Sequence, residues 1–224
     1  MEEQKRIASH AAVEHVKDGM RVGLGTGSTV KYAIERLGER VQDGLDVVGV
    51  ATSKETDERA RQASIPLEEL DEQPIDVTID GADQVDPALQ LIKGGGGALL
   101  REKMVADRSR QVVIVVDESK LVEAFTFPLP VEVTLYGWKS VAARLKEQRL
   151  QPNLRPDFVT DNGNIILDCS YDALTDLHGL AAGLNGIPGV VEHGLFLDTA
   201  TAVIVGTPEG AKTIRRNEDM AHTP

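Results

Sequence analysis

The stretch Gly23–Thr29, which reads GLGTGST, decides the fold because it joins an apolar strand at 21–24 to an amphipathic helix. In that helix, apolar residues recur at helical spacing, at Val30, Ala33, Ile34, Leu37 and Val41. A strand, a glycine loop and a helix would place the amides of Thr26, Gly27, Ser28 and Thr29, with two hydroxyl groups, at a helix N-terminus, which favours a bound phosphate. The loop is not the dinucleotide fingerprint, because Ser28 stands at the third glycine, and it lacks the lysine of a P-loop. On this segment alone, a turn with Ser28 as an ordinary N-cap is an equally good interpretation.

Segments of helical and strand periodicity alternate around this loop up to about residue 117, which is typical of helices packed on a mostly parallel sheet. Further strands are predicted at 46–51, 75–81 and 111–117. The last of these, QVVIVVD, is apolar enough for the centre of a sheet that is covered on both faces. Thr52 and Glu55 have the spacing of a capping box, which predicts that the next helix starts there.

A second, smaller α/β pattern begins after the prolines at 128 and 130. Strands are expected at 131–135, 163–168 and about 194–197, and helices at 138–148 and 173–184. The strand TAVIVG at 201–206 and the segment after it could return to the first sheet. We therefore expect a catalytic domain of residues 1–127 plus 201–224, and an inserted domain of residues 128–200 that takes part in oligomerisation.

The composition favours a soluble cytoplasmic protein. Of the 224 residues, 41% are hydrophobic, enough for a real core, and no apolar run approaches a membrane span or a signal peptide. The 36 acidic residues against 24 lysines and arginines give a net charge of −12, which disfavours non-specific binding to nucleic acid or to an anionic membrane. Cys169, the single cysteine, cannot form an internal disulfide and is best interpreted as a small core residue.

The segment DGADQVD places Asp80 and Asp83 at the carboxyl end of an apolar strand, where open α/β sheets bind their ligands. A calcium loop would need alternating oxygen ligands and a glutamate at its twelfth position, where this sequence has Leu91. A metal is therefore not expected here. The alternative for Asp80 is ordinary turn chemistry, because aspartate often precedes glycine in turns.

The four glycines of LIKGGGGALLREK (91–103) cost conformational entropy that a plain connection would not require, so a ligand is expected close to this backbone. Lys93 can neutralise an anion, and Glu102 on the following helix can face the same pocket. Taken alone, the segment is better interpreted as a flexible loop with a solvated lysine and a glutamate paired to Arg101 or Lys103.

The remaining candidates are weaker. Lys120, in the segment DESK, follows a central strand and lies at the same edge of the sheet, although by itself it reads as solvated. The five histidines show no metal-ligand spacing, so no zinc site or other cofactor is expected: His10, His15, His178, His193 and His222.

Taken together, these segments resemble ribose-5-phosphate isomerase, type A. The matching stretches are GLGTGST, DGAD, KGGGGALLREK and DESK, followed by TDNGN (160–164), IPGVVEHGLF (187–196) and IVGTPEGAKTI (204–214), in that order and over nearly the whole chain. One departure is Gln84, where the resemblance leads us to expect an acidic residue. The resemblance implies an α/β fold, with a Rossmann-like, mostly parallel sheet domain and a smaller α/β (ferredoxin-like) domain, in a homodimer or homotetramer.

The resemblance also implies a metal-free interconversion of ribose 5-phosphate and ribulose 5-phosphate through an enediolate. Glu102 would be the base that moves a proton between C2 and C1, with a pKa tuned by Lys93 and partial burial. Lys93 would stabilise charge on the substrate oxygen, Asp80 would shuttle hydroxyl protons, and Asp83 would bind or assist. The implied substrate-binding positions are Thr26, Gly27, Ser28, Thr29, Gly81, Ala82, Gly94, Gly95, Gly96 and Lys120, with Lys5 as a lesser candidate for the phosphate.

Two alternatives of other classes stay open at this stage. A non-catalytic sugar-phosphate sensor would need no Glu102 with Lys93, and the sequence shows no helix-turn-helix extension. An enzyme of related fold, such as a sugar-phosphate deaminase or a coenzyme A transferase, would release ammonia or form a covalent thioester at a glutamate.

Overall fold

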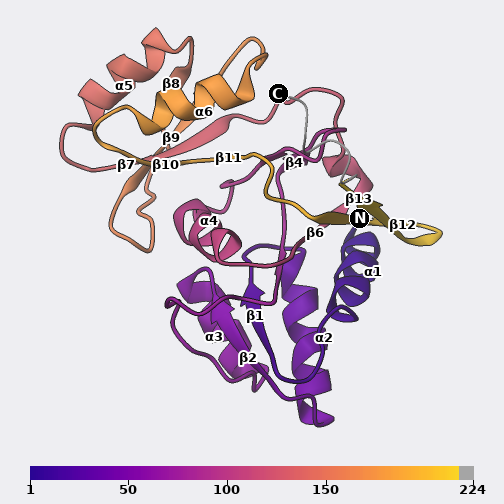
Figure 1. Ribbon diagram of the computed structural model, residues 1–224. Coiled ribbons are helices and arrows are strands. Elements are labelled where there is room, and N and C mark those ends of the chain that lie inside the picture. Colours follow the sequence, from indigo (N-terminus) through magenta and orange to yellow (C-terminus); the bar gives the residue numbers. More distant parts are fainter. Residues whose placement is uncertain (217–224) are drawn as a thin grey trace.

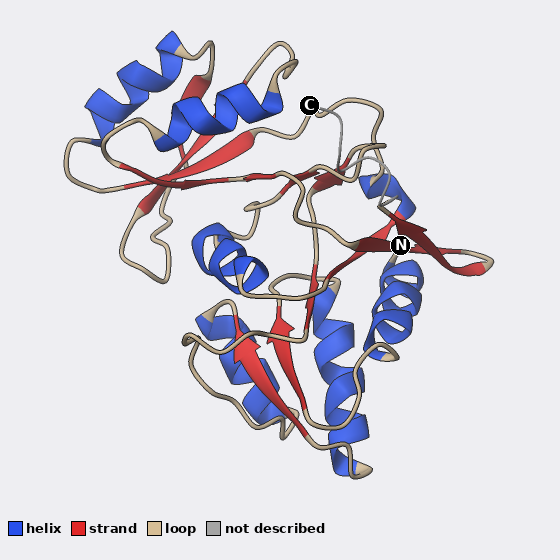
Figure 2. Ribbon diagram, viewed as in Figure 1, coloured by secondary structure: helices blue, strands red, loops and turns tan. Residues whose placement is uncertain are grey.

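The computed structural model describes residues 1–216 and is built around a six-stranded sheet (Figures 1 and 2). Five of its strands are mutually parallel, and β13 alone is antiparallel to its neighbour. In spatial order the strands are β13 (Gly210–Arg215), β12 (Ala202–Thr207), β6 (Val112–Asp117), β3 (Val77–Asp80), β1 (Met20–Leu24) and β2 (Val47–Ala51). This arrangement confirms the predicted α/β class with a mostly parallel sheet.

The alternation of side chains along β6 shows how both faces of the sheet become covered. Val113 and Val115 join a core cluster with helices α1 (Glu2–Val13), α2 (Val30–Gln42) and α3 (Lys54–Gln62). Ile114 and Val116 point to the opposite face, into the cluster that contains helix α4 (Leu99–Asp107). All six residues of β6 are buried, as expected for a parallel strand between two layers of helices.

A four-stranded antiparallel sheet forms the smaller α/β unit, which lies at the other end of the molecule in Figure 1. Its chain order is β7 (Leu129–Val133), α5 (Trp138–Glu147), β8 (Gln151–Leu154), β9 (Ile165–Ser170), α6 (Leu177–Asn185) and β10 (Val190–His193). The spatial order β10-β7-β9-β8 of this βαββαβ unit is the ferredoxin-like arrangement, with α5 and α6 together on one side of the sheet (Figure 1).

A three-stranded sheet connects the two units. It consists of β4 (Gln84–Val85), β5 (Leu91–Ile92) and β11 (Leu195–Phe196). Because β5 runs directly into Lys93, the pairing of β5 with β11 fixes the start of the glycine run. After β11 the chain returns to the six-stranded sheet through β12 and β13.

Several local predictions need correction. Ser53, and not Thr52, is the N-cap of α3, and its hydroxyl accepts a hydrogen bond from the amide of Thr56, because Thr52 turns inward and donates to the carbonyl of Leu24. Helix α6 begins at Leu177 rather than 173, since Asp176 caps it. Strands β8 and β10 were not predicted: Gln151–Leu154 is a polar strand at the edge of its sheet.

Residues 217–224, including His222, were assigned to the larger domain and lie outside the described residues. Among the helices of residues 1–216, none has the length and apolar character needed to cross a membrane.

Candidate active site

The loop between β1 and α2 is built against the end of β3. At Gly25, a Cβ atom would lie 2.1 Å from Oδ1 of Asp80, so only glycine allows this approach. The amide of Thr26 donates to the same Asp80 oxygen at 3.1 Å. The Thr26 hydroxyl turns toward a buried group of hydroxyls, within 2.8 Å of Oγ1 of Thr52 and of Oγ of Ser53. Thr26 therefore uses its amide and hydroxyl to fix the loop, which differs from the expectation that they would point at a ligand.

The outer part of this loop remains available. Thr29 is the N-cap position of α2 but makes no side-chain cap hydrogen bond, and Ser28 is not the N-cap that the alternative interpretation required. The Ser28 hydroxyl instead lies 3.1 Å from Nζ of Lys5, which comes from α1. A cation, two hydroxyls and the N-terminus of α2 thus meet at one place, which suits a phosphate group.

Asp80 ends β3 in the interior of the protein. Its Oδ1 accepts hydrogen bonds from the amides of Thr26 and Gly81, and its Oδ2 pairs with Nζ of Lys93 at 3.0 Å. Because both oxygens are engaged, Asp80 acts structurally as a bridge between the first loop and Lys93.

Lys93 is only 3% exposed, and its ammonium group has polar partners inside the protein. Its Nζ donates to the carbonyl of Gly81 at 2.6 Å and pairs with Asp80 and with Oε1 of Glu102, the latter at 3.2 Å. The ring of Phe196 lies 5.3 Å from the same ammonium group. Burial opposes the charge, but the two carboxylates outweigh it and raise the pKa of Lys93 above its ordinary value.

Glu102 lies in the first turn of α4 and is 4% exposed, so it is fully buried rather than partly buried as predicted. Burial, followed by the negative charge of Asp80, raises its pKa to about 8, although Lys93 acts in the opposite direction. Its Oε2 atom is buried without a hydrogen-bond partner among the described residues. A carboxylate with one oxygen held by a cation and the other unpartnered is well suited to accept a proton from a ligand.

Most of these residues line one pocket of about 230 Å³. Its walls are Thr26, Gly27, Ser28, Thr29, Gly81, Ala82, Asp83, Lys93, Gly94, Gly96, Glu102 and Lys120. Every wall residue belongs to the predicted set, whereas three predicted residues do not line the pocket: Lys5, Asp80 and Gly95. Lys5 and Asp80 contact wall residues through Ser28 and Lys93, and the amide of Gly95 donates to Oδ2 of Asp83 at 2.7 Å.

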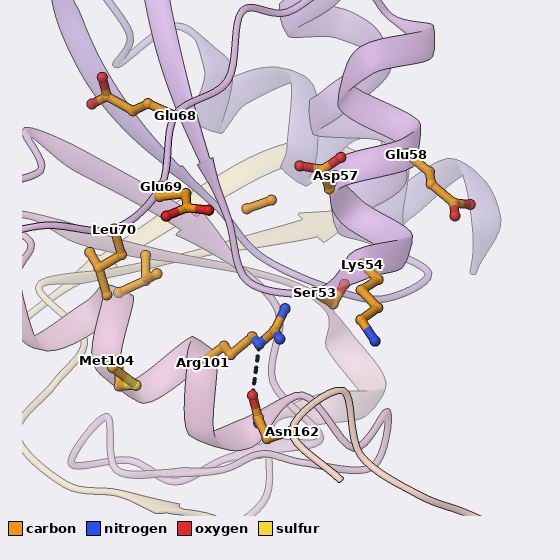
Figure 3. A pocket seen from close by; sticks show the side chains of 12 residues that line it. Ser53, Lys54, Asp57, Glu58, Glu68, Glu69, Leu70, Arg101, Met104 and Asn162 are labelled. Atoms are coloured by element: carbon orange, nitrogen blue, oxygen red, sulfur yellow. Dashed lines mark hydrogen bonds between the residues drawn. The ribbon is translucent and has the colours of Figure 1, made fainter.

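A larger cavity, of about 560 Å³, lies along another side of α4 (Figure 3). Arg101 lines it and donates a hydrogen bond to Asn162 at 3.0 Å. Two of its four acidic residues are engaged elsewhere, because Asp57 pairs with Arg61 and Glu68 pairs with Arg21. The smaller pocket is the better candidate for chemistry, since it alone of the two brings a buried lysine against a carboxylate with an unpartnered oxygen.

Sequence reasoning did not identify the residues that support the pocket from behind. The Thr52 and Thr56 hydroxyls hold Thr26, Phe196 lies beside Lys93, and Arg155 and Phe158 contact the glycine run. Arg155 and Phe158 lie shortly before the stretch TDNGN, which was noted only as a resemblance. None of these residues has a spacing that predicts its contact, because each acts across a long sequence separation.

The departure at Gln84 is explained by local hydrogen bonds. Its Oε1 accepts from the amides of Thr126 and Phe127, and its Nε2 donates to the hydroxyl of Thr126 at 2.8 Å. An acidic residue could accept the same two amide hydrogen bonds. Gln84 does not line the pocket, so the departure leaves the candidate chemistry unchanged.

Comparisons with known proteins identify the family. The family described as ribose 5-phosphate isomerase A (phosphoriboisomerase A) matches residues 48–210. The ribose-5-phosphate isomerase A of Listeria monocytogenes is 52% identical over 214 residues, covering 92% of this chain and 96% of the relative. The ribose-5-phosphate isomerase A of Bacillus mycoides is 48% identical over 215 residues, covering 93% and 97%.

Solved structures give the same result. A D-ribose-5-phosphate isomerase in complex with phospho-erythronic acid superposes with a TM-score of 0.93 at 42% identity, over 96% of this chain and 99% of that one. Ribose 5-phosphate isomerase A from Methanocaldococcus jannaschii superposes with a TM-score of 0.92 at 42% identity, with the same coverage.

Proposed function

The chain belongs to the ribose 5-phosphate isomerase A family, and from that premise we propose which of its residues carry out the reaction. The protein is an aldose-ketose isomerase that interconverts D-ribose 5-phosphate and D-ribulose 5-phosphate, a step of the pentose phosphate pathway. In the direction from aldose to ketose, C2 loses a proton and C1 gains one, while O2 loses a proton and O1 gains one. The enediolate between the two sugars therefore needs a carbon base and a group that stabilises negative oxygen.

Glu102 is the proposed carbon base. The observation that carries this assignment is its unpartnered, buried Oε2 atom in the wall of the pocket, beside an Oε1 that Lys93 holds in place. A pKa raised by burial makes the carboxylate a stronger base than an exposed glutamate, at the cost of a smaller ionised fraction at neutral pH. The same oxygen can take the proton from C2 and return it to C1, because these carbons are adjacent.

Lys93 is the proposed stabiliser of the enediolate. Its charge is held in the wall of the pocket at low solvent exposure, where an ammonium group interacts strongly with developing negative charge. When Glu102 accepts the proton it becomes neutral, which weakens its attraction for Lys93 at the moment when the substrate oxygen becomes negative.

The two aspartates receive different roles in this proposal. Asp83 lines the pocket and is the better placed of the two to exchange protons with the sugar hydroxyls during ring opening. Asp80 does not line the pocket, and its oxygens already have three partners, so we assign it to positioning Lys93 and the Thr26 loop rather than to proton shuttling.

The phosphate is proposed to bind at the N-terminus of α2. Ser28 and Thr29 supply hydroxyls and amides, Lys5 lies 3.1 Å from Ser28, and Lys120 contributes a second cation from the same pocket wall. In an acidic protein these local cations attract an anionic sugar, although Nζ of Lys5 also pairs with Oε1 of Glu2 at 2.9 Å. The glycine run then lies along the sugar, where Gly96 faces open space.

We also propose that the chain has two domains, residues 1–127 plus 201–224 and residues 128–200, and forms a homodimer or homotetramer. Sheet membership supports the division, because all four strands of the antiparallel sheet fall within the second range. Leu135 and Tyr136 support association, since Tyr136 is 94% exposed beside an exposed leucine. Light scattering after gel filtration would test the oligomeric state.

A cytoplasmic location is proposed from the single buried cysteine, which cannot form an internal disulfide.

Glu102→Gln, assayed with ribose 5-phosphate in the presence of a metal chelator, tests the proposed base. We expect wild type to turn over, and the variant to lose activity by about 10² to 10⁴, the usual contribution of a positioned base. Binding of the sugar phosphate should persist, because the phosphate contacts are unaltered. Wild-type-like turnover by the variant would overturn the assignment of Glu102, and absence of turnover by wild type would overturn the substrate assignment.

A further inference from the structure

Arg155 lies behind the glycine run, directly after β8 of the smaller unit. Its Nη1 donates to the carbonyl of Gly95 at 3.1 Å and its Nη2 to the carbonyl of Gly94 at 3.2 Å. The neighbouring edge of the guanidinium group, formed by Nε and Nη2, pairs with both carboxylate oxygens of Asp168, at 2.9 and 2.6 Å. The guanidinium group is therefore fixed on one edge by a bidentate ion pair and presents the other edge to two consecutive peptide groups.

The glycine run that Arg155 holds is a tight turn that requires glycine at two positions. Gly94 and Gly97 have φ values of +103° and +82°, and the amide of Gly97 donates to the carbonyl of Gly94 at 2.9 Å. Phe158 closes the back of the turn, because a Cβ on Gly97 would lie 2.1 Å from its ring, and the Arg155 guanidinium carbon lies 5.2 Å from the centre of that ring. The smaller unit thus supports one side of the run, while Gly94 and Gly96 line the pocket on the other.

The hydrogen bonds of Arg155 act on two peptide groups next to the pocket. The Gly95 carbonyl belongs to the same peptide group as the amide of Gly96, and the Gly94 carbonyl to the same group as the amide of Gly95. A cation bound to a carbonyl oxygen polarises the peptide group and makes its N–H a stronger donor. The Gly95 amide already donates to Asp83, and the Gly96 amide belongs to a residue in the pocket wall.

We propose that Arg155, anchored by Asp168, is a positioning residue of the isomerase reaction, which fixes and polarises the peptide groups of Gly94–Gly96 where they meet the sugar. This inference rests on the proposed function, which places the sugar along the glycine run and the phosphate at Ser28 and Thr29. It predicts an effect on turnover that is separate from phosphate binding, because the hydrogen bonds of Arg155 go to Asp168 and to the glycine run and not to Ser28 or Thr29.

The experiment compares Arg155→Met with wild type, measuring kcat and KM for ribose 5-phosphate, the inhibition constant of inorganic phosphate, and the melting temperature. We expect kcat to fall by about 10-fold to 100-fold, the scale associated with a displaced active-site group, while the inhibition constant of phosphate changes by less than about twofold. Arg155→Lys keeps the positive charge but lacks the planar guanidinium group with its several fixed donors, so it should recover part of the lost kcat. Asp168→Asn should lower kcat less than Arg155→Met does.

Arg21→Met is the matched control. Arg21 is also a buried arginine that pairs with carboxylates, of Glu68 and Asp71, and donates to two backbone carbonyls, but its partners lie outside the pocket. It should lower the melting temperature while keeping kcat within about twofold of wild type. If Arg155→Met does not fold, Arg155→Lys and Asp168→Asn decide the question.

Two results would overturn the role of Arg155. One is a kcat within twofold of wild type in Arg155→Met. The other is an equal weakening of turnover and phosphate binding, which would indicate a general structural defect. Wild type and Glu102→Gln are measured in the same assay: an active wild type with an inactive Glu102 variant upholds the proposed function even where the Arg155 variants behave as wild type.

Discussion

Nζ of Lys93 lies 3.2 Å from Oε1 of Glu102, and the other oxygen of that carboxylate is buried without a hydrogen-bond partner in residues 1–216. The ion pair therefore fixes the direction of the carboxylate without occupying both of its oxygens. Lys93 favours the ionised form, but burial and the charge of Asp80 outweigh it and raise the pKa of Glu102 to about 8. The Lys93–Glu102 pair therefore affects both the pKa of Glu102 and the direction of its carboxylate.

The first prediction concerns the pH dependence of turnover. Only the ionised form of Glu102 can accept the proton from C2, so kcat/KM of wild type should rise by about tenfold per pH unit below pH 8 and level off above it. The substrate phosphate titrates near pH 6 and can be distinguished by its lower midpoint. Initial rates between pH 5.5 and 9.5 test this. A profile that is flat from pH 6.5 to 9 would show that the base has an ordinary pKa.

The second prediction is that the same carboxylate lowers stability. Between the ordinary value of 4.5 and about 8, the folded state holds a proton on Glu102 that the unfolded state has released. Stability from this group is therefore lost as pH rises through that window. Glu102→Gln removes the titration, so its melting temperature should exceed that of wild type by a margin that grows from pH 5 to pH 8.5. Glu147→Gln, which alters an exposed ion pair with Arg144, is the control and should show no such trend. A Glu102→Gln variant less stable than wild type at pH 8.5 would contradict the prediction.

Much of the fold could be predicted from the sequence because its strands are strongly apolar. The run 111–117 is the clearest case, since the five consecutive apolar residues Val112–Val116 identify a central strand by composition alone, and all of them are buried. The polar strand β8 at the edge of its sheet could not be predicted in this way, because its stability comes from pairing with β9 rather than from its own side chains.

The residues of the pocket could be predicted for a different reason. They sit in segments where glycine, aspartate and lysine follow the ends of strands, but each segment read alone leaves an ordinary alternative open. Lys93 and Lys120 read as solvated, and Glu102 as a surface glutamate, until the order and spacing of all the segments are compared with the family. The degree of burial of Glu102, and supporting residues such as Arg155 and Thr52, depend on packing between distant segments that no local pattern encodes.

The third prediction concerns Gln84, which stands where an acidic residue was expected. In Gln84→Glu the side chain can still accept hydrogen bonds from the amides of Thr126 and Phe127, and the Thr126 hydroxyl can reverse and donate to it. We expect wild-type kcat and a free energy of unfolding within about 0.5 kcal/mol of wild type. Gln84→Leu removes the acceptor of the two amides and should cost about 0.5 to 1.5 kcal/mol, because the Thr126 amide is exposed and water can replace the lost acceptor. Urea unfolding of the two variants tests this, and equal stabilities would show that the bridge to residues 126 and 127 does not contribute.

The fourth prediction concerns His193, a buried histidine between the two units. Its Nδ1 lies 3.3 Å from the amide of Leu195, and its Nε2 is buried without a partner among the described residues. Burial, together with the charge of Lys103, lowers its pKa to about 4, although Glu192 acts in the opposite direction. The folded protein therefore keeps this imidazole neutral at pH values where the unfolded chain would protonate it.

The sign of the resulting pH effect follows from proton binding. Between pH 6.5 and about 4 the unfolded state binds the proton and the folded state does not, so stability falls as the pH falls through this window. A difference of this size corresponds to about 3 kcal/mol, lost progressively by pH 4. His193→Asn keeps an acceptor for the amide of Leu195 but cannot titrate, so its free energy of unfolding should decline less steeply than that of wild type. Urea unfolding at pH 7, 6, 5 and 4.5 measures both slopes, with His178→Asn at an exposed histidine as the control. Parallel slopes for wild type and His193→Asn would mean that the pKa of His193 is the same in the folded and the unfolded protein, which would contradict the prediction.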